Sequence, residues 1–260
     1  MKTLDFHKPL LMGILNLTPD SFSDGGKYGD PQAALRHLQQ LLDEGADMID
    51  IGAESTFGPE AQVSADEEWS RLEPILSQID FKRVFVSVDT HKAEVAEKAL
   101  RVGVQMINDV TALRGDSHMI EVLLKHRPYV CLMFSAYNTP YAGREARQYD
   151  DVIKSIKIFL RAQTELLISA GFPRDRIILD PGLGFFLSSD PGPSWEVIDR
   201  LAELKELGFP ILIGPSMKSF LGGEIRDRLP KSLEAGKKCL QNGANIIRMH
   251  EVGKYRHQLF

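Results

Sequence analysis

The chain has 260 residues, enough for one large α/β domain with a sizeable core. Its 43% hydrophobic and 26% charged residues are typical of a globular protein, and a net charge of −5 argues against nucleic acid or an anionic membrane as the main partner. The cysteines, Cys131 and Cys239, belong to no metal-binding motif and are expected to be buried free thiols, which fits a reducing cytoplasm. The first residues lack the apolar core of a signal peptide, and no apolar run reaches membrane-spanning length, so we expect a cytoplasmic protein.

Short apolar runs alternate with amphipathic segments along the chain. We expect strands near residues 9–15, 47–52, 84–88, 104–108, 129–133, 176–179, 210–214 and 245–248. We expect helices near residues 32–45, 65–79, 91–102, 117–126, 150–171, 194–207, 231–242 and 253–259. Strand-then-helix units repeated eight times in about 260 residues predict an α/β fold of the TIM-barrel type, with residues 1–260 as a single domain. A doubly wound sheet is the alternative, because periodicity does not show whether a sheet closes.

The first predicted strand changes character at its end. It is apolar from Leu10 to Leu17 except for Asn16, and a polar, Gly-rich loop follows as far as Gly26. A buried amide is costly without hydrogen-bond partners, so Asn16 is a candidate ligand-binding residue. The alternative is a simple turn, because Asn, Pro, Asp, Ser and Gly all favour turns.

Polar residues also stand at the ends of the other predicted strands. The residues singled out are Asn16, Thr56, Asp89, Asn108, Asp180, Lys218, Ser219, Arg248 and His250. In a TIM barrel the carboxyl ends of all strands meet at one face, which carries the active site. Helix capping explains any one such residue, and it is the preferred interpretation for Asp20, Thr90 and Asp116. Convergence of so many polar strand ends favours a site.

Seven of these nine side chains fall into two chemical groups. Carboxylates, an amide and an ammonium suit a neutral heterocycle with ring N–H and amino groups, and the members are Asp89, Asn108, Asp180 and Lys218. An amide, a guanidinium and an imidazole suit an anion, and the members are Asn16, Arg248 and His250. Because Mg²⁺ often bridges few protein oxygens and several phosphate oxygens, Asn16 is also a candidate metal ligand. The pattern predicts a pocket for a flat polar ring beside a magnesium phosphate site.

The order of motifs from about Leu10 to Val252 resembles the dihydropteroate synthase family. The matching stretches are Met12–Gly26, Asp50–Thr56, Val88–Thr90, Ile107–Val110, Ile178–Phe185, Lys218–Phe220 and Ile247–His250. The resemblance implies a TIM barrel, usually dimeric, that joins 6-hydroxymethyl-7,8-dihydropterin pyrophosphate to p-aminobenzoate. The products are 7,8-dihydropteroate and pyrophosphate.

Carried over residue by residue, the resemblance implies a role for each candidate. The pterin would be held by Asp89, Asn108, Asp180 and Lys218. The pyrophosphate would be held by Asn16, Arg248 and His250, with Mg²⁺ on Asn16, and Thr56 and Ser219 would lie near p-aminobenzoate. The residues expected to be catalytic are Asp89, Asp180, Lys218, Arg248 and His250, because pyrophosphate leaves first and a pterin cation forms.

The sequence departs from the family pattern at four places. Phe57 stands where the family commonly has an Arg on a mobile loop, and Met217 replaces a second Arg. Strand five ends Met133-Phe134 in place of Met-His, and Gly184-Phe185-Phe186-Leu187 replaces Gly-Phe-Gly-Lys. The Gly-Phe-Phe-Leu form and the missing loop Arg resemble the sulfonamide-resistant branch of these enzymes. Our hypothesis is that Phe186 or Phe57 crowds the aryl site and weakens sulfonamide binding more than substrate binding.

The lost cations leave two alternatives to a working synthase. One is a synthase-like paralogue that binds a pterin without catalysing the condensation. The other is a pterin-binding methyltransferase domain, against which the Asn16–Gly26 loop and the Lys218 motif argue.

Overall fold

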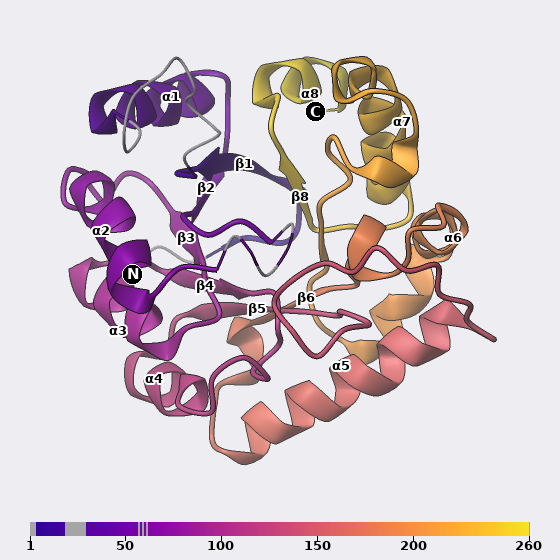
Figure 1. Cartoon of the computed structure of the whole chain (residues 1–260), viewed down its shortest axis with the longest axis horizontal. Coiled ribbons are helices and arrows are strands. Elements are labelled where there is room, and N and C mark those ends of the chain that lie inside the picture. The colour runs from indigo at the N-terminus through magenta and orange to yellow at the C-terminus, as the bar shows by residue number, and fades with distance from the viewer. Residues whose placement is uncertain (1–3, 19–29, 57, 59, 61, 260) are drawn as a thin grey trace.

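The computed structural model describes residues 4–18, 30–56, 58, 60 and 62–259 of the chain. Its parallel strands form one sheet in the order β6-β5-β4-β3-β2-β1-β8-β7. The two ends of this order meet through a parallel bridge between Leu179 and Ile211, and the Leu179 N–H donates to the Pro210 carbonyl at 2.9 Å. The sheet therefore closes into the predicted TIM barrel, with the helices in a ring around it (Figure 1). The doubly wound alternative is wrong, because an open sheet has no such closing bridge.

Strands and helices alternate along the described chain, as predicted. The strands are β1 Leu10–Asn16, β2 Met48–Gly52, β3 Val86–Asp89, β4 Met106–Asp109, β5 Tyr129–Met133, β6 Ile177–Asp180, β7 Leu212–Ile213 and β8 Ile246–Met249. The helices are α1 Pro31–Asp43, α2 Ala65–Leu76, α3 Ala93–Val102, α4 Met119–His126, α5 Val152–Ser169, α6 Gly192–Asp199, α7 Leu229–Gln241 and α8 Val252–Leu259. Short 3₁₀ segments include η3 Arg174–Arg176, η4 Gly184–Phe186, η5 Leu201–Leu207 and η6 Ser219–Leu221. The single helix predicted over 194–207 is divided into α6 and η5 at Arg200, whose φ of −103° and ψ of 14° are not helical.

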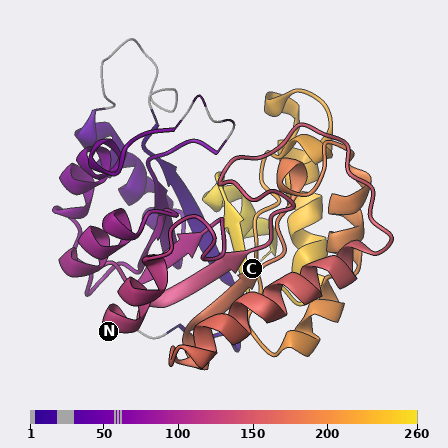
Figure 2. The same ribbon diagram turned by 60° about the horizontal axis from the view of Figure 1, so that its bottom comes forward.

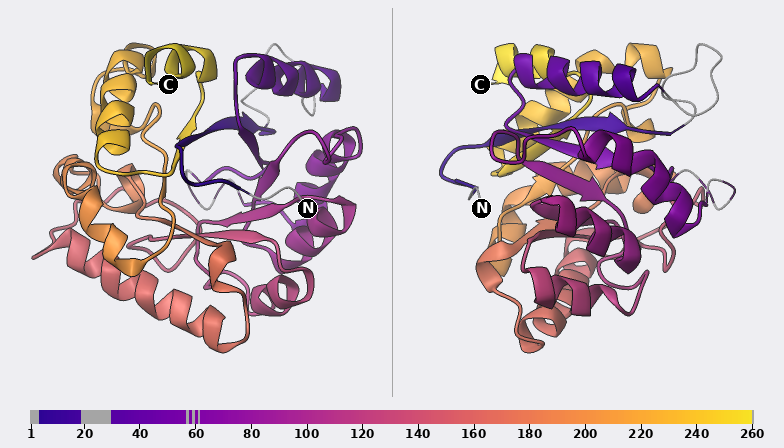
Figure 3. Two further views of the ribbon diagram at one scale, coloured as in Figure 1. Left: turned by 180° about the vertical axis from the view of Figure 1, so that it is seen from behind. Right: turned by 90° about the vertical axis from the view of Figure 1, so that its left-hand side faces the viewer.

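The barrel has two apolar layers, set by the alternation of side chains along each strand. Outward-facing residues such as Leu11, Ile49 and Val88 pack against the ring of helices. Inward-facing residues such as Met12 and Met48 fill the interior at the amino-terminal end of the barrel. The side view in Figure 3 shows the strands running through the middle of the molecule with helices outside them. Cys131 and Cys239 are buried free thiols, as predicted.

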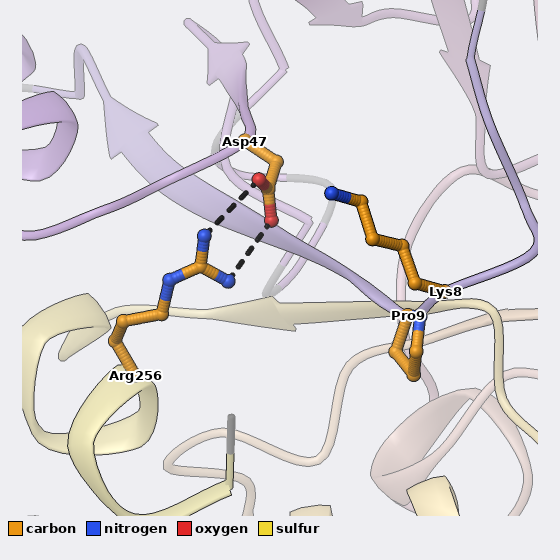
Figure 4. Close-up of a pocket in the computed structure, with 4 residues that line it drawn as sticks. All are labelled: Lys8, Pro9, Asp47 and Arg256. Carbon is orange, nitrogen blue, oxygen red and sulfur yellow. Dashed lines mark hydrogen bonds and ion pairs between the residues drawn. The ribbon is translucent and has the colours of Figure 1, made fainter.

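The amino-terminal end of the barrel carries a small surface pocket. It is lined by Lys8, Pro9, Asp47 and Arg256, and Arg256 pairs with Asp47 across it at 3.2 Å (Figure 4). Asp47 also accepts a hydrogen bond from the Leu11 N–H at 2.9 Å. The ion pair therefore joins the residue before β2 to α8, and the hydrogen bond from Leu11 adds β1. In TIM barrels the amino-terminal end contributes to stability. No helix in the described part of the chain is long and apolar enough to cross a membrane.

Candidate active site

The same inward-facing positions become polar toward the carboxyl end of each strand. Met48 is followed two residues later by Asp50, and Ile246 by Arg248. Side chains two residues apart on a strand point to the same face, so the apolar interior leads directly into a polar pocket floor. Strand register then places Asp89 opposite Asn108 and Gly52. The structure therefore gathers the predicted pterin-side residues at one end of the barrel.

Asp50 is the centre of this pocket floor. Its Oδ2 accepts hydrogen bonds from Arg248 Nε at 2.6 Å and from Asn108 Nδ2 at 3.1 Å. Arg248 extends further and donates from Nη2 to Asp89 Oδ2 at 3.2 Å. The guanidinium thus joins two carboxylates that come from different strands. Burial lowers the pKa of Arg248, but Asp50 and Asp89 outweigh that effect and leave it raised.

The charges around Asp89 do not balance. Burial and the neighbouring Asp50 raise the pKa of Asp89 to about 7, although Arg248 opposes them. Two carboxylates share one guanidinium here, so this part of the pocket favours a cation or a hydrogen-bond donor. Such an environment suits a ring that carries N–H and amino groups and acquires positive charge.

Asp180 and Lys218 occupy the other side of the pocket. The Gly182 N–H donates to Asp180 Oδ1 at 2.7 Å, and burial raises the pKa of Asp180. Gly182 has a φ of 69°, and a Cβ there would collide with the Phe134 carbonyl, so glycine is required at this turn. Lys218 Nζ lies 3.3 Å from the Leu183 carbonyl, and burial lowers the pKa of Lys218 to about 8 against the attraction of Asp180.

An apolar wall lies beside these polar groups. Val110, Met133 and Phe186 are buried and pack together, with Ala142 against them. Val110 follows β4, two residues after Asn108, and Met133 on β5 lies opposite Asp180 on β6. A flat heterocycle needs this combination, because its faces are apolar and its edges make hydrogen bonds.

His250 lies exposed at the rim of the pocket. Its Nδ1 is 3.0 Å from Ser216 Oγ, which also accepts the His250 backbone N–H at 3.3 Å. Partial removal of the imidazole from water, together with repulsion from the Arg248 and Lys218 cations, lowers the pKa of His250 to about 4. The imidazole is therefore neutral at pH 7. When the Ser216 hydroxyl donates to Nδ1, Nε2 becomes a donor that suits an anion.

Asn16 ends β1 beside the same pocket. A Cβ placed on Gly52 would lie 3.7 Å from Asn16 Oδ1 and 3.5 Å from the Cβ of Asp89, so both side chains flank Gly52. In the part of the chain that is described, no three His, Cys, Asp or Glu side chains lie close enough together to hold a metal ion. A neutral amide oxygen fits Mg²⁺ only as one of several ligands, the others being water and phosphate oxygens.

The two predicted aryl-side residues lie on different loops. Ser219 begins η6 directly after Lys218, and its Oγ lies near the backbone of Gly184. Thr56 lies beyond β2, and its carbonyl accepts the Ala142 N–H from the loop between β5 and α5 at 2.9 Å. The structure therefore joins Thr56 to that loop and Ser219 to the Lys218 side of the pocket.

Other polar strand-end residues serve the backbone, as expected for capping residues. Asp116 accepts the Ala93 N–H at the start of α3 at 2.9 Å, and Thr90 Oγ1 accepts the Lys92 N–H at 3.2 Å. Asp109 accepts hydrogen bonds from the backbone N–H groups of Thr111 and Leu113, so both of its carboxylate oxygens are occupied within its own loop. Asp20 lies outside the described residues.

Asp50 is the residue of the candidate site that the sequence analysis did not single out. The signal was present, because a fully buried carboxylate interrupts the apolar strand Met48-Ile49-Asp50-Ile51. Asp50 is two residues before Gly52, so the two residues lie on the same face of β2, which would have placed Asp50 inside the barrel.

The four departures from the family pattern lie in different surroundings. Phe57 lies outside the described residues, Met217 stands half-buried at the rim, and Phe134 and Phe186 are buried.

A closed parallel barrel with buried carboxylates, an amide and cations at its carboxyl end has the architecture of a TIM-barrel enzyme, whose active site lies at that face. The pterin binding enzyme family matches residues 12–250 of this chain. The dihydropteroate synthase of Neisseria meningitidis serogroup B is 42% identical over 254 residues, covering 94% of this chain and 88% of that protein. The chain belongs to the pterin binding enzyme family, among its dihydropteroate synthases.

Solved structures agree with this assignment. A Clostridium difficile dihydropteroate synthase, crystallised in the presence of pteroic acid, has a TM-score of 0.87 and 38% identity, covering 97% of this chain and 95% of that one. The Xanthomonas albilineans enzyme with 4-aminobenzoic acid has a TM-score of 0.90 and 36% identity, covering 98% and 92%.

Proposed function

We propose that this chain condenses 6-hydroxymethyl-7,8-dihydropterin pyrophosphate with p-aminobenzoate, giving 7,8-dihydropteroate and pyrophosphate. It is a transferase of the dihydropteroate synthase family, and the alternative of a non-catalytic paralogue is not favoured. The observation that carries the proposal is the buried cluster of Asp50, Asp89, Asn108 and Arg248 at the catalytic end of the barrel. The methyltransferase alternative is likewise not favoured.

The pterin would lie on the pocket floor against the apolar wall. Asp180 and Asn108 would accept and donate hydrogen bonds at the ring edge, with Lys218 beside Asp180. As the bond to pyrophosphate breaks, positive charge develops on the pterin, and the carboxylates of Asp89 and Asp180 stabilise it electrostatically. The amine of p-aminobenzoate then attacks the exocyclic carbon and loses a proton.

Arg248 and His250 would hold the departing pyrophosphate. Arg248 offers a fixed, charged fork, and neutral His250 adds an uncharged donor. We propose that Asn16 ligates Mg²⁺ together with pyrophosphate oxygens, so that the metal would supply charge neutralisation for the leaving group. Thr56 and Ser219 would contact p-aminobenzoate, with Phe186 narrowing that site against sulfonamides.

We further propose that residues 1–260 act as one domain, that the enzyme is a homodimer, and that it works in the cytoplasm. The homodimer is proposed from the family resemblance. Dimers with two-fold symmetry are also the commonest soluble homo-oligomers. The location agrees with the buried free thiols.

Pyrophosphate release tests the proposed reaction. With dihydropterin pyrophosphate, Mg²⁺ and p-aminobenzoate, Asp180→Asn should lower kcat/KM by roughly 10²–10³-fold, because the variant loses the negative charge opposite the developing cation. Asp175→Asn is the matched control, since Asp175 is exposed on η3, just before the start of the same strand, and its variant should behave as wild type. A wild-type chain that binds the pterin tightly but releases no pyrophosphate would establish the paralogue in place of the synthase.

A further inference from the structure

The loop between β5 and α5, residues 134–151, spans the catalytic end of the barrel. Figure 2 shows it passing over one end of the barrel before it enters α5. On one side it contacts the segment after β2, and on the other side the segment after β6. The Ala136 N–H donates to the Phe186 carbonyl at 2.9 Å, and the Tyr149 hydroxyl donates to the Leu187 carbonyl at 2.7 Å. This β5–α5 loop is therefore fixed to the Phe186 side of the pocket.

Its contact with the segment after β2 depends on Glu54. The Glu54 side chain is only 8% exposed, and its Oε2 pairs with Lys92 Nζ at 2.5 Å. Its Oε1 accepts the Tyr141 hydroxyl at 3.1 Å and the Val63 N–H at 3.3 Å. One carboxylate thus joins α3, the β2–α2 segment and the β5–α5 loop.

The charge balance around Glu54 makes the Tyr141 hydroxyl important. Lys92 Nζ also pairs with the buried Glu68 at 2.6 Å, so two carboxylates share one ammonium. Burial and Glu54 raise the pKa of Tyr141, so its hydroxyl stays protonated and donates to the excess negative charge. Hydrogen bonds to a buried carboxylate are among the stronger ones in proteins.

A second hydrogen bond lies next to the first. Ala142, the residue after Tyr141, donates its N–H to the Thr56 carbonyl at 2.9 Å, and its side chain packs against the apolar cluster that contains Phe186. Tyr141 and Ala142 therefore hold Glu54 and Thr56 from one short stretch of chain. The same stretch thus contacts Thr56 and the cluster of Phe186, two of the three residues that the proposed function places at the aryl site.

We propose that Tyr141 is a positioning residue for p-aminobenzoate. Its hydroxyl fixes Glu54, and through Ala142 the β5–α5 loop sets the distance between Thr56 and Phe186. This inference rests on the proposed function, because it concerns the second substrate of that reaction. It assigns the β5–α5 loop the task of shaping the aryl site, whereas the hydrogen-bonding groups of the pocket floor, such as Asp50, Asn108 and Arg248, come from the barrel strands.

Steady-state kinetics of Tyr141→Phe test the inference. The KM for p-aminobenzoate should rise about 5- to 30-fold, as expected for one lost charge-assisted hydrogen bond, while kcat and the KM for dihydropterin pyrophosphate stay within about twofold. Tyr137→Phe is the matched control on the same loop. Within the described residues the buried Tyr137 hydroxyl has no hydrogen-bond partner, so its removal should leave both KM values unchanged.

The possible failures are distinct. A wild-type chain that forms no dihydropteroate would reject the proposed function, and Tyr141's role with it. An active wild type whose Tyr141→Phe variant keeps its KM for p-aminobenzoate would reject Tyr141's role alone. An equal rise in both KM values, or the same rise in Tyr137→Phe, would mean general loosening of the loop and would also overturn the inference. A thermal melt within a few degrees of wild type shows that the variant is folded.

Discussion

The Asp50 carboxylate is fully removed from solvent on the pocket floor. It is bonded to Arg248 and Asn108 through one oxygen, and its other oxygen has no partner in the described part of the chain. A buried hydrogen bond between charged groups is worth more than an exposed ion pair, even though Asp89 also pairs with Arg248. Asp50 therefore supports both the fold and the position of the Arg248 guanidinium.

Asp50→Asn should lower the free energy of unfolding by about 1.5–3 kcal/mol, measured by urea denaturation, because a buried charge-assisted hydrogen bond is lost while Asp89 still compensates Arg248. The same variant should lose activity, because Arg248 is then held by Asp89 alone. Asp47→Asn is the matched control at the other end of the barrel, where the Asp47–Arg256 pair is about one-third exposed and should cost no more than about 1 kcal/mol. Equal losses in both variants would contradict the special role of Asp50.

The segment between β7 and α7 shows how an element holds the side chain of Lys218, which we propose to be catalytic. Met217 has a φ of 57°, a left-handed conformation that is unfavourable for a side chain of this size. Its N–H donates to the buried Ser232 hydroxyl at 3.0 Å, and its carbonyl accepts Arg228 Nη1 at 3.0 Å. Lys218 follows directly, so α7 determines where the lysine enters the pocket. An arginine at position 217 would need the same left-handed backbone conformation. Methionine in place of the family's arginine therefore changes the charge at the rim of the pocket.

Ser232→Ala should raise the KM for dihydropterin pyrophosphate several-fold, because the Met217 N–H loses its acceptor and Lys218 moves. The free energy of unfolding should fall by about 1–3 kcal/mol, the usual cost of an unpaired buried donor. Ser155→Ala provides the control, since the Asp151 carbonyl that accepts the Ser155 hydroxyl also accepts the Ser155 N–H. A variant that is destabilised but keeps its KM would show that Ser232 has only a structural role.

Sequence patterns were sufficient for the elements and for most of the polar side chains that the barrel gathers at its carboxyl end, for identifiable reasons. Each strand is a short buried apolar run, and each candidate residue stood where such a run ended. Pairing between strands was beyond the pattern, because Asp50 and Arg248 are 198 residues apart and meet only when the barrel closes. The same holds for Tyr141 and Glu54, which are 87 residues apart on different loops. Closure, and with it these contacts, depends on the whole sheet.

The molecule as a whole concentrates buried charge at one end. The charges that act on Asp89, on β3, are those of Asp50 from β2, Arg248 from β8, Glu68 from α2 and Asp109 from β4. Three of these four neighbours are acids, so burial and repulsion together hold the pKa of Asp89 at about 7 against an ordinary value of 3.8. Between those two pH values the folded chain keeps a proton that the unfolded chain has lost. The free energy of unfolding contributed by this group therefore falls as the pH rises.

Replacing Asp89 by Asn should remove this pH dependence, because an amide does not ionise in the range. The difference in unfolding free energy, wild type minus Asp89→Asn, should decrease by on the order of 1–3 kcal/mol between pH 4.5 and 7.5. Chemical denaturation of both ligand-free proteins across that range measures it, and titration of Asp180, which is present in both, cancels in the difference. A difference that stays constant or increases with pH would mean that Arg248 keeps Asp89 ionised throughout. In that case the pocket would carry its full negative charge before the pterin enters.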